Sequence, residues 1–150
     1  MLPHRIAAGG VIVNEGKILL VRYPDIRGGS YLVSPGGAVE ENEGLAEAAI
    51  RETREETGVT VAVQRLLALE ELLCTRFRMC KVWFLCAYVS GEAGMTEGAR
   101  REGITQAAWF SKDELAREVV YPSILLSNDW ASFSSPGWSV KTMEIRRADF

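Results

Sequence analysis

Three glutamates near the middle of the chain have the residue type and spacing of a metal-binding cluster. Glu52, Glu55 and Glu56 stand at i, i+3 and i+4, so they share one side of a helix. Like charges at this spacing destabilise a helix by about 0.2–0.5 kcal/mol per pair. Hard divalent cations such as Mg²⁺ and Mn²⁺ bind carboxylate oxygens and would offset this cost. The spacing therefore indicates a cation site suited to phosphate chemistry.

The acidity of the chain is concentrated around these glutamates. Residues 40–56 hold seven Glu and two Arg, a balance of −5, whereas the net charge of the whole chain is −3, so the remaining residues sum to +2. An acidic patch repels phosphates unless cations lie between them. No basic stripe of the kind that binds nucleic acids is present, so we expect a small-molecule substrate and neither nucleic acid nor membrane as partner.

An ordinary solvated helix face is the competing interpretation of the same charges. Arg51 lies four residues before Glu55, and Arg54 is nearby, so ion pairs along the helix would explain them without a metal. The turn Ser34-Pro35-Gly36-Gly37 ahead of the helix favours the metal site, because glycine lets backbone approach a ligand closely.

The element that must position the glutamates is a helix over 45–57. Gly44 is placed as its N-cap with Glu47 at N3, and Gly58 suits the left-handed position that ends a helix. Ala48 is expected to lie among the glutamates and to leave room above the helix. The predicted core-facing residues are Leu45, Ala46, Ala49, Ile50, Thr53 and Thr57.

Other segments predict a mixture of strands and short helices. The expected strands are 6–13, 17–23, 31–33, 59–69, 81–90 and 104–110. We predict a hairpin loop at 14–16, a polar loop at 91–101, a capping box at Ser111 and Glu114, and a last helix from Pro122 to about Phe133. This order favours an α/β (α+β) sandwich with a mixed sheet, and 150 residues fit a single domain over 1–150.

Bulk features place the chain among cytoplasmic proteins. It has no apolar run of 18 residues, and its first ten residues lack the layout of a signal peptide. The three cysteines are an odd number without close pairs, which argues against a disulfide framework. They are expected to be buried and reduced.

The segment from Gly37 to Val59 resembles the Nudix box, Gly-x5-Glu-x7-Arg-Glu-U-x-Glu-Glu-x-Gly-U with U aliphatic. The fixed positions present are Gly37, Glu43, Arg51, Glu52, Glu55, Glu56 and Gly58. Thr53 departs from the first aliphatic position, and Ser34 stands where Leu often precedes the Pro-Gly-Gly turn. The box covers about a sixth of the chain and implies a Nudix-type α/β/α sandwich.

The resemblance also implies roles for particular residues. Glu52, Glu55 and Glu56 would be catalytic and would bind Mg²⁺ or Mn²⁺, with the Gly36 carbonyl as a further ligand. Arg51 would orient a box carboxylate, Glu43 would fix the loop to the helix, and Gly37 and Gly58 would give structural support. The general base is expected to be Glu55, with Glu102 as the second candidate and a further metal ligand.

Hydrolysis of a pyrophosphate linkage is the activity that this family implies. The expected substrate is a nucleoside triphosphate or nucleoside diphosphate derivative, with ADP-ribose or another nucleotide-sugar as the alternative. A Nudix-fold nucleotide-binding module without catalysis is the other functional class, and the family makes a homodimer an open option. Phosphate-binding and stacking residues stay unassigned among Arg22, Arg27, Arg76, Arg78 and Lys81, and Tyr23, Tyr31, Phe77, Trp83 and Trp109.

Overall fold

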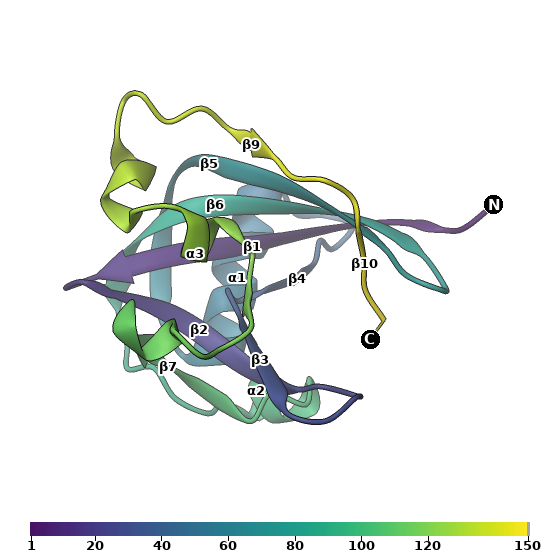
Figure 1. Ribbon diagram of the computed structural model, residues 1–150, viewed down its shortest axis with the longest axis horizontal. Coiled ribbons are helices and arrows are strands. Elements are labelled where there is room, and N and C mark those ends of the chain that lie inside the picture. The colour runs from purple at the N-terminus through teal and green to yellow at the C-terminus, as the bar shows by residue number, and fades with distance from the viewer. Residues whose placement is uncertain (150) are drawn as a thin grey trace.

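The computed structural model describes residues 1–149 and shows a strongly curved mixed sheet with helices on both sides (Figure 1). The strands are β1 (His4–Asn14), β2 (Lys17–Pro24), β3 (Ser30–Val33), β4 (Gly36–Ala38), β5 (Thr60–Leu73), β6 (Arg78–Ser90), β7 (Gln106–Phe110), β8 (Val120–Tyr121), β9 (Lys141–Thr142) and β10 (Arg146–Arg147). The helices are α1 (Leu45–Thr57), α2 (Glu97–Arg101) and α3 (Ile124–Ser127), with 3-10 turns η1 (Asp113–Leu115) and η2 (Trp130–Ser134).

The sheet consists of two parts that share one hairpin. In the first part β10, β5, β6 and β1 lie side by side, with β4 on β1 and β9 on β5. In the second part β7, β2, β3 and β8 are neighbours. The pairs β1–β6, β5–β10, β5–β9 and β3–β8 are parallel and the others antiparallel, so the sheet is mixed as predicted.

The β1–β2 hairpin joins the two parts at one end only. Its paired residues are Val13 with Ile18 and Asn14 with Lys17. The two-residue loop, Glu15 and Gly16, has positive φ at both positions (51° and 76°), the conformation that matches the twist of a tight hairpin. From this loop β1 and β2 diverge as a V (Figure 1). The opposite ends of the two parts therefore lie apart, and side chains from both face the space between them.

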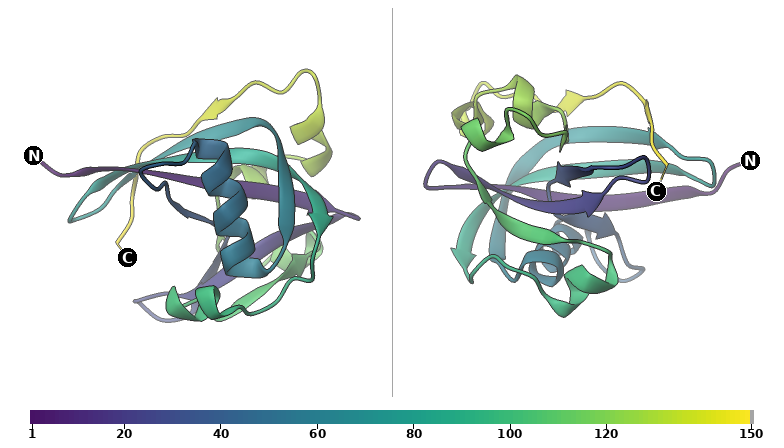
Figure 2. Two further views of the ribbon diagram at one scale, coloured as in Figure 1. Left: turned by 180° about the vertical axis from the view of Figure 1, so that it is seen from behind. Right: turned by 60° about the horizontal axis from the view of Figure 1, so that its bottom comes forward.

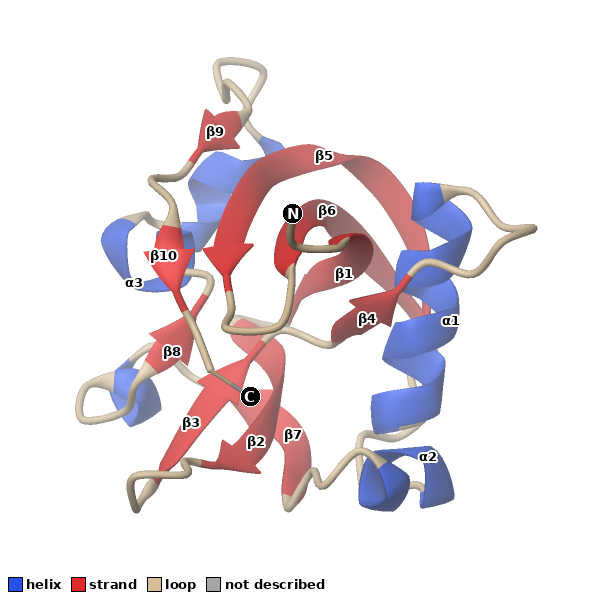
Figure 3. Ribbon diagram, turned by 90° about the vertical axis from the view of Figure 1, so that its right-hand side faces the viewer, coloured by secondary structure: helices blue, strands red, loops and turns tan. Residues whose placement is uncertain are grey.

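Helix α1 lies on one side of this sheet and α3 with η2 on the other (Figures 2 and 3). This arrangement is the α/β/α sandwich that the sequence predicted. The largest apolar cluster lies between the sheet and the segment that contains α3 and η2, and it includes Trp83, Leu20 and Phe133.

The bounds of α1 follow from its two flanking glycines, as predicted. Gly44 is extended (φ −77°, ψ 167°), and its N–H donates to Glu47 Oε1 at 3.4 Å. Gly58 ends the helix at φ 80°, and its N–H donates to the Arg54 carbonyl at 2.9 Å. The helix therefore begins and ends where local backbone chemistry dictates, and this fixes the direction of every side chain on it.

The core-facing side of α1 differs from the prediction by part of a turn. Leu45 is 40% exposed, whereas Ala48 is fully buried against Ala8, Ala49 and neighbouring apolar side chains. Ala48 is therefore small because the helix backbone lies close to β1, and it leaves no room among the glutamates. The shift turns Glu56 inward, so that it is only 2% exposed.

Three further predictions about elements were wrong. Residues 36–38 form β4 instead of continuing the predicted turn 34–37, because β1 offers a free edge for Gly9 to pair with Gly36. Residues 97–101, expected to be loop, form α2 with Thr96 as N-cap. The last helix does not run to Phe133. It ends at Ser127, and η2 follows as a separate turn whose N-cap is Asp129.

The capping box and the cysteines behave as predicted. Ser111 N–H donates to Glu114 Oε1 at 3.0 Å, and Glu114 N–H donates to Ser111 Oγ at 3.3 Å, although the helix they begin is a single 3-10 turn. Cys74 and Cys86 are buried and Cys80 partly buried, and all three are free thiols. Within residues 1–149, no helix has both the length and the apolar character needed to cross a membrane.

Candidate active site

Glu56 is the most deeply buried of the box glutamates, and both of its carboxylate oxygens have donors. The Gly36 N–H donates to Oε1 at 2.7 Å, and the Tyr23 hydroxyl donates to Oε2 at 3.0 Å. Three segments thus meet at one carboxylate: the last turn of α1, the start of β4 and the end of β2. The carboxylate orientation is fixed by these two hydrogen bonds before any ligand arrives.

Burial gives Glu56 an unusual proton affinity. Removal from water raises its pKa from 4.5 to about 8, and the nearby Glu52 carboxylate adds to the rise. The hydrogen bond from Gly36, the positive charge of Lys81 and the Tyr23 hydrogen bond oppose it. A buried carboxylate under this strain would bind a cation readily, because a positive ion removes the cost of its charge.

Glu52 lies directly against the glycine turn. A Cβ at Gly37 would stand 2.6 Å from Glu52 Cδ and 2.7 Å from each of its oxygens. Glycine is therefore required at this position to admit the carboxylate next to the backbone. Burial raises the Glu52 pKa, while the adjacent Arg51 opposes the rise. The structure thus brings Glu52 and Glu56 to the same end of β4, close enough for the Glu52 charge to raise the Glu56 pKa.

Arg51 gathers the other carboxylates of the region. Its guanidinium bonds Glu43 at 2.6 and 2.9 Å, Glu52 at 3.0 Å and Glu55 at 3.1 Å, and donates to the Ala38 carbonyl at 3.0 Å. The hydrogen bonds from Arg51 lower the Glu43 pKa to about 2. These contacts are those expected of an arginine that orients box carboxylates and of a glutamate that fixes the loop to the helix, and both roles stay predictions.

Helix α2 packs against the end of α1 where Glu55 lies. The Thr96 hydroxyl donates to the Glu55 carbonyl, and Gly94 N–H donates to the Thr57 carbonyl at 3.0 Å, so carbonyls left unpaired at the end of α1 gain donors. A Cβ at Gly98 would lie 2.7 Å from the Glu55 carbonyl, so α2 contacts this turn closely. The Glu55 carboxylate itself stays half exposed, at 52%.

Glu102, the second candidate base, ends α2 and is brought toward the same region. Its charge acts on both Glu52 and Tyr23 and raises the pKa of each. Glu102 and Glu56 are 46 positions apart in the sequence, and the packing of α2 on α1 thus brings them toward the same region. Glu102 is exposed, so it is free to reach a ligand or a bound water.

The donor set fits a hard divalent cation in its chemistry. It comprises buried and half-buried carboxylates next to a glycine backbone, with no sulfur or imidazole among them. Within residues 1–149 no three acidic, histidine or cysteine side chains already converge as a metal cage. The reason is Arg51, whose Nη1 holds both Glu52 and Glu55. A bound cation would replace Arg51 as the partner of the glutamate oxygens.

The sequence candidates for substrate contacts separate into different environments. Trp83 is fully buried in the core, as the default for strand aromatics predicted. Arg22 pairs with Glu118, and Arg78 pairs with Glu71, at 3.0 and 2.7 Å. Tyr23 alone among the candidate aromatics bonds a box glutamate. The sequence alone could not distinguish this role from core packing, because it does not indicate which residue a strand tyrosine contacts.

A large cavity lies away from these glutamates. It has a volume of about 1030 Å³ and runs between the β1–β2 hairpin, β6 and the segment of α3 and η2. Asn14, Tyr88 and Trp130 are among its lining residues, and none of the box glutamates lines it. The Lys112 amine at its edge already donates to the carbonyls of Leu125 and Asn128, each at 2.8 Å. The acidic site is therefore an open surface between elements rather than this cavity.

Gly37→Ala is expected to lower turnover by about ten- to hundredfold with little loss of stability. The new Cβ meets the end of a side chain, Glu52, which can swing away and thereby leaves its proposed ligand position. Gly36→Ala provides the contrast, because its Cβ would meet backbone, Gly9 Cα at 2.7 Å and the Ala8 carbonyl at 2.8 Å. That variant should lose stability itself.

Thermal unfolding and steady-state kinetics check this pair, with Gly94→Ala as the matched control. A Cβ at Gly94 meets no atom within 4 Å, and both activity and melting temperature should stay unchanged. Wild-type turnover in Gly37→Ala would contradict the assignment of Glu52.

Comparison with known proteins agrees with this geometry. The family model described as NUDIX domain matches residues 3–126. Nudix hydrolase 10 of Arabidopsis thaliana is 32% identical over 55% of this chain and 29% of its own length. The ADP-ribose pyrophosphatase of Methanocaldococcus jannaschii is 38% identical over 44% of this chain and 39% of its own. The chain spans less than half the length of the curated relatives it matches.

The solved structures agree as well. The crystal structure of a MutT NUDIX hydrolase from Burkholderia pseudomallei superposes with a TM-score of 0.68 at 26% identity, covering 83% of this chain and 96% of that one. The fold is therefore shared over most of both chains. On the match over residues 3–126, this chain belongs to the Nudix hydrolase family.

Proposed function

We propose that this protein is a metal-dependent hydrolase that cleaves the pyrophosphate linkage of a nucleoside triphosphate or a nucleoside diphosphate derivative. The observation that carries the proposal is Glu56: a buried carboxylate fixed by two donors, beside Glu52 and the glycine turn. Fold stability gains nothing from such a group. We also propose that residues 1–150 act as one domain and that the protein is cytoplasmic.

Mg²⁺ or Mn²⁺ is the proposed cofactor. The residues that would hold it are Glu52, Glu55 and Glu56, with the Gly36 carbonyl and Glu102 as further donors. When bound, such an ion neutralises charge on a diphosphate and lowers the pKa of a water ligand. The protein's own part is orientation: Gly36 N–H and the Tyr23 hydroxyl hold Glu56, and Arg51 holds Glu52 and Glu55.

Glu55 is the proposed general base. Its half-exposed carboxylate is the box glutamate that a water molecule reaches most easily, and it lies on the same face of α1 as Glu52. Glu102 is the alternative base, since its charge is felt by Glu52 and Tyr23 from the end of α2. The base takes a proton from the attacking water, and a phosphorylated fragment leaves.

A nucleotide panel tests the proposed function directly. Purified protein is incubated with nucleoside triphosphates, dinucleotides, ADP-ribose and other nucleotide-sugars, with phosphatase-coupled phosphate detection. Turnover should need Mg²⁺ or Mn²⁺ and vanish in EDTA. ADP-ribose belongs in the panel because a relative is named as its pyrophosphatase. Absence of metal-dependent turnover across the panel would contradict the proposal.

The second functional class, a nucleotide-binding module without catalysis, is favoured by one feature. Arg51 ion pairs occupy Glu52 and Glu55, so no three of the described acidic residues form a preformed cage. A binding measurement with product analysis separates the classes. Tight metal-dependent binding with intact substrate after prolonged incubation would select the module.

A further inference from the structure

Beyond Glu56, a chain of contacts links the two parts of the sheet on the side where they diverge. The Tyr23 ring stacks on Tyr31 at 5.6 Å, and Tyr31 packs edge-on against Tyr121 at 5.9 Å between ring centres. The Arg146 guanidinium lies over the Tyr121 ring, 3.9 Å from its centre. Tyr23 in turn bonds Glu56, so this row of rings leads from the proposed metal site to Arg146.

Two charged residues of the first part of the sheet, Glu70 and Lys81, link Arg146 back to Glu56 and so close the row of contacts. Arg146 Nη2 lies 3.5 Å from Glu70 Oε2. The Lys81 amine lies over the Trp83 ring at 4.6 Å and interacts electrostatically with both Glu70 and Glu56. We name these groups the aromatic–cation ring: Tyr23, Tyr31, Glu56, Glu70, Lys81, Tyr121 and Arg146. It draws on α1, on both parts of the sheet and on the C-terminal segment.

Arg146 reaches this ring only because the C-terminal segment returns to β5. Strand β10 pairs in parallel with β5, with Arg146 opposite Leu72, and Figure 3 shows β10 beside both β5 and β8. Arg146 lies outside the 3–126 match to the family model. The family pattern therefore assigns it no role.

The charges of the ring leave a place for an anion. Glu70, whose side chain is 6% exposed, faces Arg146 and Lys81; burial lowers the Lys81 pKa, and the charges of Glu70 and Glu56 oppose that change. The other carboxylate, Glu56, is the one proposed to bind a divalent cation. Once it does so, it no longer neutralises the positive charge of Lys81 or Arg146. Arg146 keeps a third of its side chain exposed, and a guanidinium presents five donors suited to phosphate oxygens.

A buried polar group next to the ring also lacks a partner. The Ser34 N–H donates to the Tyr121 carbonyl at 3.1 Å, which places Ser34 beside that residue. Its hydroxyl is buried, and no hydrogen-bond partner for it exists in the part of the chain that the structure describes. A bound ligand or water is the usual way in which such a group is satisfied.

We infer that Arg146 is a substrate-binding residue that contacts a phosphate group of the nucleotide, with Lys81 as its cationic neighbour. This inference rests on the proposed function and names a contact for that same site. The Tyr121 ring orients the guanidinium by stacking, and Glu70 limits its movement. Of the C-terminal segment, Arg146 thereby belongs to the substrate site of this protein.

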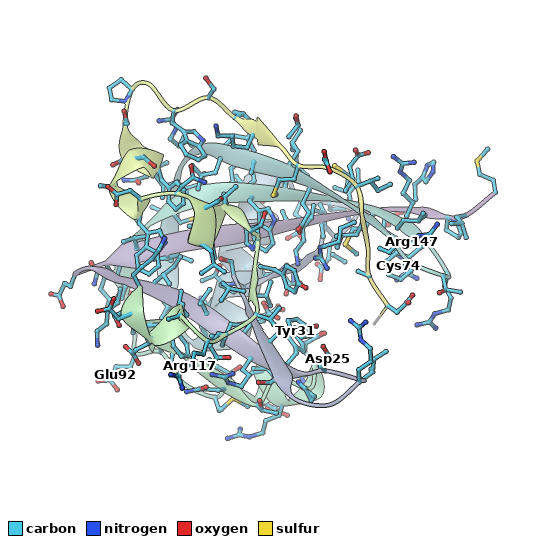
Figure 4. The ribbon with its side chains drawn as sticks, viewed as in Figure 1. Asp25, Tyr31, Cys74, Glu92, Arg117 and Arg147 are labelled. Atoms are coloured by element: carbon cyan, nitrogen blue, oxygen red, sulfur yellow. The ribbon has the colours of Figure 1, made fainter. Side chains whose placement is uncertain are left out.

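Arg146→Gln tests the inference, with the adjacent Arg147→Gln as the matched control. Neighbouring strand residues point to opposite faces, and Arg147 is exposed. In Figure 4 the labelled Arg147 and Tyr31 lie on opposite sides of the C-terminal segment. Arg146→Gln should raise KM about ten- to hundredfold and change kcat little. Arg146→Lys should recover part of the loss, and Arg147→Gln should match wild type.

Two further measurements guard against a folding artefact and against failure of the proposed function. The double variant Arg146→Gln/Glu70→Gln removes both partners of the Arg146–Glu70 ion pair, and it should keep the fold and the raised KM. Calorimetric titration with inorganic pyrophosphate in the presence of Mg²⁺ should show weaker binding in Arg146→Gln than in Arg147→Gln. An unchanged KM in Arg146→Gln, or an equal rise in Arg147→Gln, overturns the inference. If no variant, wild type included, hydrolyses any nucleotide but pyrophosphate binding still depends on Arg146, then the proposed function alone has failed.

Discussion

Glu56→Gln is expected to reduce kcat by about a thousandfold, within the range of about 10²- to 10⁴-fold for loss of a group that acts in the transition state. The amide has the shape of the carboxyl group and can keep both hydrogen bonds, to Gly36 and Tyr23. It cannot supply a negative charge to a divalent cation. Steady-state kinetics over a Mg²⁺ series measure the effect, and circular dichroism confirms the fold.

The same variant should gain stability at high pH. Burial raises the Glu56 pKa from 4.5 to about 8, so the folded chain binds this proton more tightly than the unfolded chain does. The free energy of unfolding of metal-free wild type should therefore fall as pH rises from about 4.5 to about 8 and then level off. Glu56→Gln lacks this group and should be the more stable protein at pH 9.

Urea unfolding in EDTA at several pH values measures this difference. A wild-type profile that coincides with that of Glu56→Gln would show that the buried carboxyl group does not titrate as described. Added Mg²⁺ should stabilise wild type and have less effect on the variant, because a ligand stabilises only the state that binds it. Loss of activity with gain of stability is the pattern that distinguishes a functional buried charge from a structural one.

Glu55→Gln is expected to lower kcat by about 10²- to 10⁴-fold while the fold and KM change little. Its carboxylate is half exposed and its Arg51 contact is one of several on that guanidinium. Exposed ion pairs contribute about 0–1 kcal/mol, so stability should not fall measurably. Glu47→Gln, an exposed glutamate in the first turn of the same helix, is the matched control and should stay active.

Glu102→Gln completes this comparison. If Glu55→Gln keeps wild-type turnover and Glu102→Gln loses it, the base lies at the end of α2. In a plot of the logarithm of the rate against pH, the fall in rate at acidic pH should disappear only in the variant that removes the base. Full turnover in both Glu55→Gln and Glu56→Gln would remove the metal assignment.

Much of the local structure of the site could be predicted from the sequence. The spacing of Glu52, Glu55 and Glu56 is a property of one helix, and Gly44 and Gly58 fix its ends through backbone conformation alone. The capping box at Ser111 and the two-residue hairpin loop are local in the same sense. Each of these features depends on atoms within a few residues, so pattern and propensity suffice.

Other features of the site depend on packing. Ala49, Thr53 and Thr57 of α1 are buried as predicted, but the buried side is rotated by part of a turn toward Ala48, which meets Ala8 of β1. The strand at residues 36–38 needed a free edge on β1, and α2 needed the end of α1 to dock on. Propensity carries no information about these partners.

The sequence by itself determined the acidic helix, its glycine turn and hence the family. Only the tertiary structure decided that Glu56 is buried between Gly36 and Tyr23, and that a row of tyrosine rings connects it to Arg146. The physical reason is the distance along the sequence over which each effect acts. Helix periodicity and glycine conformation act over one or two turns. Burial and charge pairing join residues much farther apart in the sequence, such as Arg22 and Glu118, which are 96 positions apart.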